Sequence, residues 1–414
     1  MSDTFAIGRI VMTPSTPPTS ESARSTRKLR CEVVTDFGRL EQLAPAWLDL
    51  LRRSSAPELM LSPLWLRCWW QIYGQGTSRQ LRVGLVYEGD CLIGLALLQL
   101  RRHWYRFGIA FRRLESLGAD GSDPDGVCSE YLNFIAEHGK EEAVLGELKA
   151  ALFQGRLGAW DEFVLPAMDG NHAMATMICE VFQGQGLSAV LAPTSEAPYI
   201  PLPPTWQQYL EKLGRHRRFL LKSLRDFDAW SGGRATYHLA QTPEQLQIGK
   251  RLLQELHAER WQAAGKDGVF RAGRFARFHD RVMPPLLELG ALELRWLSVE
   301  ERPLAAIYNI RWNNKIYFYQ SGRTLDLPPN IRAGIVLHAH CIRQAIADGC
   351  REYDFLAGVS QYKQQLALSS RPIVQFRLTK GGWRERTLRL ASAIRAYARS
   401  SPSPPCRPLT GGRG

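Results

Sequence analysis

Two short runs of the sequence carry residue types that could hold a phosphate group. Gln320 and Ser321 end a β-prone run, and Arg332, Ala333 and Gly334 begin the next apolar-periodic run. A helix N-terminus presents unpaired amides and the positive end of the helix dipole, so it binds anions. Gly334 would permit close approach of the backbone, and Arg332 adds charge. The alternative is an ordinary helix start with a surface arginine.

The phrase REYDFLAG, residues 351–358, predicts a buried strand that ends in a glycine bend. Alternate side chains of a strand share a face, so Glu352 and Asp354 point to the same side. A carboxylate there could act as a general base or hold the acceptor of a transfer reaction. Alternatively, Asp354 accepts structural hydrogen bonds from a neighbouring loop. Gly358, at the bend, is a candidate cofactor contact.

An aromatic run and a basic helix supply candidate substrate-binding residues. In IYFYQSG, residues 316–322, Tyr319 could contact an acceptor, although most of these aromatic residues are expected to pack in a core. Upstream, Arg218 and Lys222 share one face of a predicted helix whose opposite face is apolar. This face could clamp a polyanion such as a nucleotide sugar, a lipid phosphate, tRNA or coenzyme A. The alternative is the solvated face of an amphipathic helix.

Other patterns exclude several kinds of site. No G-x-S-x-G nucleophile elbow occurs, which fits direct transfer without a covalent enzyme intermediate. Eight cysteines are scattered without a CxxC pair, and no His, Cys and Asp residues have metal-ligand spacing. We therefore expect neither a metal site nor a disulfide framework. His338 falls on the apolar stripe of its helix, which predicts a buried structural histidine.

The composition is typical of a folded protein with two or three domains. The 414 residues are 45% hydrophobic and 22% charged. The 53 lysine and arginine residues exceed the 40 aspartate and glutamate residues, which gives a formal net charge of +13. This charge favours polyanionic partners without choosing among them. The sequence contains no run of about 18 apolar residues, so it predicts no membrane span. It also shows no apolar signal segment near the start. We expect a cytoplasmic protein with reduced thiols.

The elements that must position these residues are clearest in the second half. TPEQ, residues 242–245, places Thr at an N-cap, Pro at the first helical position and Gln at the capping-box position. It predicts a helix over 242–264, and Pro284-Pro285 predicts a kink or break in the next one. The remaining expected elements are a helix, three antiparallel strands, a helix, a strand, a short helix and a last strand, over 273–289, 291–299, 303–312, 315–321, 333–348, 351–356, 361–368 and 372–379.

The first half predicts a similar order of elements. The hairpins VYEGDCLIGLAL and VEERPLAAIYNI match between the halves, which indicates a duplicated unit. A Pro-rich stretch, 192–204, lies between the halves. The expected helices are 40–53, 63–73, 140–153 and 172–183, and the expected strands are 81–88, 91–101, 111–117, 130–135, 162–165 and 187–191.

We therefore predict an α/β (α+β) fold with two tandem units, each a mixed, mostly antiparallel sheet flanked by helices. Pro, Gly and Ser enrichment marks the ends of the chain as disordered. The expected division is a leader over 1–28, a first unit over 29–195, a linker with the basic helix over 196–240, a second unit over 241–385, and a basic tail over 386–414.

Several phrases, together with this order of elements, resemble the GNAT acyltransferase superfamily. Within it they resemble the CelD/BcsL-type proteins linked with bacterial cellulose synthesis, which are related to the two-domain FemABX aminoacyl transferases. The resemblance covers about 29–380 and implies two GNAT-like units, the first of them degenerate. The phrases are LRCWWQIYG (66–74), VCSEYLNFI (127–135), LHAERWQAAGKDGVF (256–270), AAIYNIRWNNKIYFYQSG (305–322) and REYDFLAGVSQYKQQL (351–366).

The resemblance implies roles for two further residues. A phrase of the type F/Y-K-x-x-F in FemABX proteins is similar to YKQQL here, which implies that Lys363 polarises the acyl carbonyl and that Tyr362 lines the pocket. Typical GNAT enzymes carry Q/R-x-x-G-x-G/A before the helix that binds the cofactor. The corresponding stretch here keeps only Gly322 and Gly334, within a longer loop.

These observations predict a GNAT-type N- or O-acyltransferase. The resemblance implies acetyl-CoA or another acyl-CoA as co-substrate, and an amine or hydroxyl acceptor in polysaccharide or envelope metabolism, without a metal or DNA. One alternative is a non-catalytic accessory protein of cellulose synthesis on the same fold. The other is a transferase that uses aminoacyl-tRNA, which the basic helix and the incomplete glycine motif favour.

Overall fold

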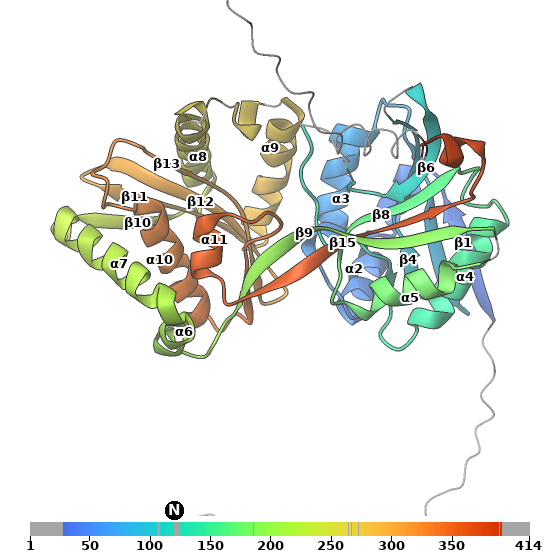
Figure 1. Ribbon diagram of the computed structural model, residues 1–414, viewed down its shortest axis with the longest axis horizontal. Helices are drawn as coiled ribbons and strands as arrows, with labels where there is room; N and C mark the ends of the chain where they lie inside the picture. Colours follow the sequence, from blue (N-terminus) through green and yellow to red (C-terminus); the bar gives the residue numbers. More distant parts are fainter. Residues whose placement is uncertain are drawn as a thin grey trace, which may run out of the picture.

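The computed structural model describes residues 28–390 except 106–107, 120–124, 185, 264, 266, 272 and 389. Figure 1 shows two helix-flanked units side by side, connected by the long strands β9 (Ser188–Pro201) and β15 (Ser369–Thr379). The mixed α/β architecture with sheets flanked by helices agrees with the predicted fold class. Nearly all of the predicted leader and most of the predicted tail lie outside the described residues.

The first unit follows the predicted order, but the helix expected over 40–53 and the strands expected over 81–88 and 91–101 are each divided in two. The helix expected over 40–53 is two helices that meet at Leu43, two residues before Pro45, because a proline ring is not accommodated inside a helix. The helices are α1 (Phe37–Gln42), α2 (Ala44–Arg53), α3 (Pro63–Trp69), α4 (Glu141–Phe153) and α5 (Ala173–Phe182). The strands are β1 (Leu29–Val34), β2 (Gln80–Leu81), β3 (Val83–Glu88), β4 (Cys91–Ala96), β5 (Leu98–Trp104), β6 (Ala110–Ser116), β7 (Ile135–Ala136) and β8 (Glu162–Asp169).

The second unit matches its predicted elements closely. Thr242 caps α8 as predicted, since its Oγ1 accepts from the Gln245 amide at 3.3 Å. Gln245 Oε1 accepts at 2.8 Å from the amide of Gln241, one residue before the amide that a capping box uses. The helices are α6 (Trp206–Lys212), α7 (Arg217–Ser231), α8 (Pro243–Ala263), α9 (Gly273–Glu288, which contains Pro284 and Pro285), α10 (Ala333–Ala347) and α11 (Gln361–Leu366). The strands are β10 (Ala235–Leu239), β11 (Leu292–Val299), β12 (Arg302–Trp312), β13 (Lys315–Arg323) and β14 (Glu352–Asp354).

One sheet of eleven strands runs through both units, in the order β10-β11-β12-β13-β14-β9-β15-β8-β6-β5-β2. A second sheet, β1-β3-β4-β7, belongs to the first unit. The last strand of each unit lies in the other unit's half of the sheet: β9 pairs with β14, and β15 pairs with β8. β9 and β15 also pair with each other from Ser188↔Thr379 to Tyr199↔Ser369. The units therefore share their backbone hydrogen bonds at the centre of the molecule.

One strand prediction is wrong, and one strand is longer than predicted. Of the strand expected over 130–135, only Ile135 forms β structure, because Tyr131 has a φ of 58°, which is outside the extended region. The Pro-rich stretch 192–204, expected between the halves, is mostly strand, since β9 continues to Pro201. The register with β15 shifts near Pro193, where a bulge accommodates the missing amide.

Helices cover both faces of the second unit's sheet. Helices α7 and α10 pack on the face that carries Ile307, Ile316 and Phe318, whereas α8 and α9 pack on the face that carries Tyr308 and Tyr317. The core beneath α8 and α9 continues into α2 and α3 of the first unit. In the part of the chain that the structure describes, no helix is both long enough and apolar enough to cross a membrane.

Candidate functional site

The sheet of the second unit opens beside the N-terminus of α10. Strands β13 and β14 pair in parallel over three residues, the last pair being Tyr317↔Asp354. β13 then continues to Arg323, whereas the chain after Asp354 turns away at Leu356, which has a φ of 57°. Among the described strands, none pairs with β13 on this side beyond Tyr317. This edge of β13 is therefore not covered by another described strand.

A β-bulge lies on β13 within the open region. The pairs Tyr308↔Gln320 and Asn309↔Phe318 leave Tyr319 as the extra residue. Bulges redirect side chains and are common next to active sites. Tyr319 is directed toward the first unit, where its hydroxyl donates to the carbonyl oxygen of Val127. This residue, predicted to bind substrate, therefore anchors the two units and does not line the cavity described next.

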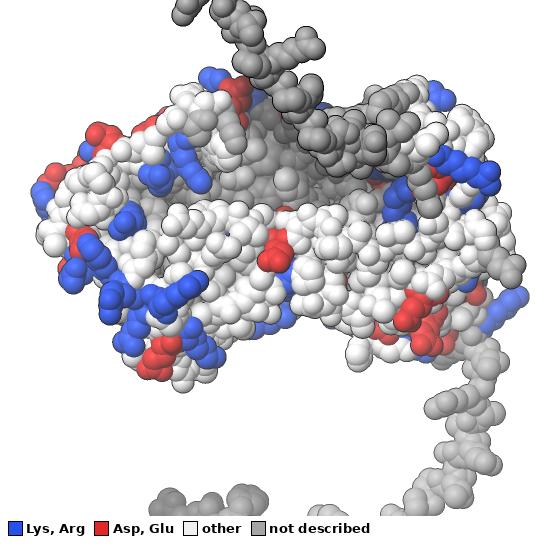
Figure 2. Space-filling model, viewed as in Figure 1, with Lys and Arg blue, Asp and Glu red and all other residues white. Residues whose placement is uncertain are grey.

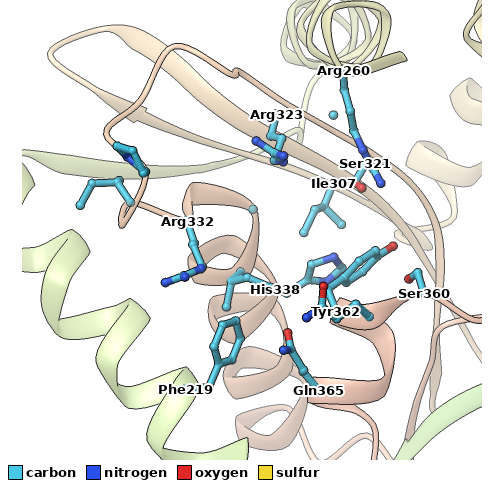
Figure 3. Close-up of a pocket in the computed structure, with 16 residues that line it drawn as sticks. Phe219, Arg260, Ile307, Ser321, Arg323, Arg332, His338, Ser360, Tyr362 and Gln365 are labelled. Carbon is cyan, nitrogen blue, oxygen red and sulfur yellow. The ribbon is translucent and has the colours of Figure 1, made fainter. Parts of the chain in front are cut away.

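A cavity of about 550 Å³ occupies the opening (Figure 3). This volume is within the range of small-molecule binding sites. The walls come from α7, α8, β12, β13, the start of α10, and α11. The lining residues are Phe219, Arg260, Ile307, Ser321, Gly322, Arg323, Pro329, Ile331, Arg332, Gly334, Ile335, His338, Ser360, Gln361, Tyr362 and Gln365.

Three guanidinium groups line this cavity from separate elements: Arg260 of α8, Arg323 at the end of β13, and Arg332 immediately before α10 (Figure 3). No aspartate or glutamate is among the described residues that line it. Burial lowers the pKa of Arg323, and the positive charge of Arg260 lowers it further. A bound anion would relieve this repulsion, and the free amides at the start of α10 would add hydrogen bonds.

Four residues predicted from the sequence line the cavity: Ser321, Arg332, Gly334 and Tyr362. They come from β13, the start of α10 and α11, so the fold brings together three segments that are separate in the sequence. The Arg332 guanidinium also lies 5.1 Å from the ring centre of Phe219 on α7. The predicted phosphate-binding helix start is therefore part of a real cavity.

Three other predicted cofactor contacts lie outside the cavity lining. Ala333 is buried in the core under α10, and Gln320 is half-buried on β13. Gly358 is exposed, and its amide donates to the carbonyl oxygen of Glu196 on β9 at 3.1 Å. These three residues are close in sequence to residues that line the cavity, but none of the three lines it.

The basic residues of α7 form an exposed surface rather than a cavity wall. Figure 2 shows lysine and arginine gathered over α6 and α7. Arg218 and Lys222 are both exposed, and Lys222 forms an ion pair with Asp226 one turn later. Neither residue lines the cavity. Their predicted contact to a substrate stays a prediction for ligands that extend beyond the cavity.

Lys363 supports the turn before α11 and is not among the residues that line the cavity. Its Nζ donates to the carbonyl oxygens of Leu356 at 3.2 Å and Ala357 at 3.0 Å. Burial lowers its pKa, and the carboxylates of Glu130 and Asp354 act in the opposite direction. Two of its three N–H groups thus donate hydrogen bonds within the turn. The predicted polarisation of an acyl carbonyl by Lys363 would require this side chain to leave the turn.

Asp354 lies in a buried ion-pair network at the contact between the units. Its carboxylate is 2.9 Å from Lys315 Nζ, and it accepts from the Tyr131 hydroxyl and from the Leu356 amide, both at 2.7 Å. Burial raises its pKa, but the charges of Lys315 and Arg371, together with hydrogen bonds from Lys315 and Tyr131, bring the pKa below its ordinary value. An ionised carboxylate with these partners is a poor base. The geometry supports the structural alternative.

Glu130 belongs to the same contact and was missed from the sequence. Its Oε2 accepts from the Ala357 amide at 2.6 Å, so a first-unit residue holds the turn that leads into α11. Burial, with the nearby charge of Asp354, raises its pKa to about 8. The single local signal was a carboxylate within the otherwise uncharged phrase VCSEYLNFI. Its partner is more than two hundred residues away in the sequence, so no local pattern identifies it.

His338 is buried, as predicted, but it also lines the cavity. Its Nδ1 lies 3.4 Å from the Tyr353 hydroxyl, and its ring stacks on Tyr362 with centroids 5.3 Å apart. Burial, together with Lys363 and Arg260, lowers its pKa to about 3, so the imidazole is neutral at pH 7. It can form a hydrogen bond but is a weak base. Within the described residues, no group of three His, Cys, Asp or Glu side chains could hold a metal ion.

The cavity and its helix start coincide with a known domain family. Residues 214–364 match the acetyltransferase (GNAT) domain family. The match extends from the segment before α7 into α11 and includes every cavity-lining residue except Gln365. The opening between β13 and β14 therefore lies within the matched region. The finer CelD/BcsL assignment is not part of this match.

Solved structures include one with a similar fold over most of the chain. FemX has a TM-score of 0.57 at 10% identity, over 87% of this chain and 99% of that chain. A conserved protein of unknown function from Bacteroides thetaiotaomicron has a TM-score of 0.48 at 12% identity, over 82% and 97%. L-PGS from Bacillus licheniformis has a TM-score of 0.46 at 13% identity, over 80% and 96%. No curated protein matches the chain.

Proposed function

We propose that the GNAT domain is an acyltransferase that takes an acyl group from acyl-CoA, such as acetyl-CoA. The arginine-lined cavity beside α10 is the observation that carries the proposal. Coenzyme A has phosphates for the three arginines, and its amide-bearing arm could pair with the free edge of β13 as an added strand would. An open cavity of this size favours catalysis over the alternative of a non-catalytic accessory protein.

The proposed transfer joins the acyl carbonyl carbon to an amine or hydroxyl of the acceptor and breaks the bond to sulfur. The acceptor loses a proton, and the departing sulfur gains one. Burial raises the pKa of Tyr362, so its phenol stays protonated at neutral pH and can donate to the leaving sulfur. His338, neutral and stacked against Tyr362, would hold that ring in place.

The proposal is tested by titrating the protein with CoA and acetyl-CoA in a calorimeter. We expect Arg332→Ala to weaken binding of both ligands about tenfold, roughly 1.4 kcal/mol, because one guanidinium–phosphate contact is lost. Arg343→Ala is the matched control, since Arg343 lies exposed on the same helix, away from the cavity. Absence of binding by the unmodified protein, or equal weakening in both variants, would contradict the proposal.

Aminoacyl-tRNA is a second candidate donor. The exposed basic face of α7 lies beside the cavity, because Phe219 of the same helix lines it. An RNA longer than coenzyme A could follow that face from the cavity. Filter binding with unfractionated tRNA at two salt concentrations, using Arg218→Glu as the variant, tests this donor. Salt-independent or absent binding, together with binding of acetyl-CoA, would exclude it.

The wider setting is part of the same proposal. We place the protein with the CelD/BcsL type, in polysaccharide or envelope metabolism in the cytoplasm, on the basis of the sequence phrases alone. We also propose that the chain divides into units over 29–195 and 241–385, with the basic helix between them and β15 exchanged into the first unit. A growth or polysaccharide phenotype of a deletion strain would test the biological setting.

A further inference from the structure

A second cavity, of about 490 Å³, adjoins the arginine-lined one. Gln361 and Gln365 of α11 line both, so the two cavities meet at this helix. The second cavity lies against the central strands, where Pro198 of β9 pairs with Ser370 of β15. A ligand held there could therefore extend toward a ligand in the first cavity.

The wall formed by α11 presents an unusual number of free amide groups. Gln361, Gln364 and Gln365 all line the second cavity, and none of their side chains has a hydrogen-bond partner among the described residues. Each amide offers two donors and an acceptor with two lone pairs. Three such groups on one short helix suit a ligand that carries several neighbouring donor–acceptor groups. Hydroxyl groups have this dual character.

The charges of the second cavity differ from those of the first. Arg215 contributes one guanidinium and Glu196 one carboxylate, and Ser370 Oγ donates to Glu196 Oε2 at 3.1 Å. The first cavity has three guanidinium groups and no carboxylate among its described lining. With one carboxylate and one guanidinium, the second cavity offers a polyanion no net attraction, whereas a neutral polar ligand could form hydrogen bonds with both groups.

Apolar surface completes the second cavity. Val359 is 53% exposed, and Pro198 and Leu368 also line the cavity. A pyranose ring has hydroxyl groups around its edge and C–H groups on its faces. The amides of α11 and the carboxylate of Glu196 could bind the edge while Val359 contacts a face. A peptide would supply one amide per residue and would use the clustered glutamines less fully.

We propose that the second cavity is the acceptor site and binds a neutral saccharide. The inference rests on the proposed acyltransferase function for its role as acceptor, but saccharide binding itself can be tested separately. A saccharide seated against Gln361 and Gln365 could direct one hydroxyl or amino substituent along α11 into the first cavity. That nucleophile would attack the acyl carbonyl there, form the new C–O or C–N bond, and release the sulfur.

The test uses the full chain and saturation-transfer difference NMR with cellobiose and, separately, N,N′-diacetylchitobiose, each with and without CoA. We expect saturation transfer to at least one disaccharide. Gln364→Leu, which changes a residue that lines only the second cavity, should reduce the signal at least fivefold. Gln247→Leu is the matched control, because Gln247 is exposed on α8 and lines neither cavity.

Two variants separate this inference from the proposed function. Arg332→Ala should lose CoA affinity but keep the disaccharide signal, and Gln364→Leu should do the reverse. Disaccharide binding without any CoA binding would support the saccharide site and overturn the acyl-CoA proposal. No signal from either disaccharide in any condition would overturn the inference, as would equal signals in Gln364→Leu and the unmodified protein. Saturation transfer to the dipeptide Gly-Gly and not to the sugars would overturn it as well.

Discussion

Two buried carboxylates at the contact between the units differ in protonation because their partners differ. Asp354 has Lys315 at 2.9 Å, and its pKa is below the ordinary value. Glu130 accepts from one backbone amide and lies near the charge of Asp354, so its pKa rises to about 8. Residue type alone would assign both the same charge at pH 7. Their environment, built from both units, sets the difference.

The raised pKa of Glu130 predicts a pH-dependent stability. Folding favours its protonated form, so its contribution is fully present below about pH 4.5 and is lost as the pH rises through about 8. Glu130→Gln should remove this dependence. We expect the free energy of unfolding of the unmodified protein, relative to the variant, to fall by roughly 3 kcal/mol between pH 5 and 7.5. Urea unfolding at several pH values measures it, and a constant difference would contradict the assignment.

At the scale of elements, the duplication is clearer in strand pairing than in residue identity. Each unit has one parallel strand pair of three residues, β6–β8 and β13–β14. Each pair begins with a cation opposite a glutamate, and the two side chains form an ion pair: Arg113 with Glu162 at 2.7 Å, and Lys315 with Glu352 at 3.2 Å. These buried pairs satisfy charges at equivalent positions of the two units. The hairpin match in the sequence indicated the duplication, but not this feature.

The two glycines of the incomplete motif have different roles, which predicts opposite results on substitution. A Cβ on Gly322 would lie 2.4 Å from the His257 amide nitrogen, so Gly322→Ala must separate β13 from α8. We expect it to destabilise the protein by about 2–4 kcal/mol. A Cβ on Gly334 would meet Arg323 Cδ at 3.5 Å, an ordinary contact.

Gly334→Ala should therefore keep or slightly raise the melting temperature, because alanine is the better helix former. Its CoA affinity should fall if the cofactor approaches the backbone at this position. Thermal unfolding and calorimetric titration of both variants measure these effects. A stable Gly322→Ala protein would show that β13 and α8 can separate without cost.

At the scale of the whole molecule, the exchange of β9 and β15 makes the two units one folding unit. Lys315 reinforces the contact, since it is buried between Glu58 of the first unit and Asp354 of the second. We expect Lys315→Met to destabilise the protein by about 3–5 kcal/mol, because buried carboxylates lose their partner. Both units should unfold together in urea.

Hydrogen exchange at increasing urea distinguishes the two units, with β6 reporting on the first and β12 on the second. Lys222→Met is the control, because Lys222 is exposed on α7 and its ion pair with Asp226 is local. Loss of protection in β12 at a lower urea concentration than in β6 would show that the units unfold separately, and that the shared strands do not couple them.

Local patterns were sufficient to predict most elements and part of the site. The N-cap at Thr242 and the alternation of 291–321 specify α8 and the three-stranded meander through interactions within a few residues. Arg332 and Gly334 were predicted because they belong to such a helix start. Arg260 and Arg323 were not, because they lie on different elements and meet only across the cavity.

The sequence by itself determined the type and order of most helices and strands, and that two similar units follow one another, because those properties depend on neighbouring residues. The tertiary structure decided which carboxylates are ionised, which carbonyl oxygens accept hydrogen bonds from Lys363, and which arginines share a cavity. It also decided that β9 and β15 cross between the units. These properties depend on partners far apart in the chain, whose approach is set by packing of the whole sheet rather than by any local pattern.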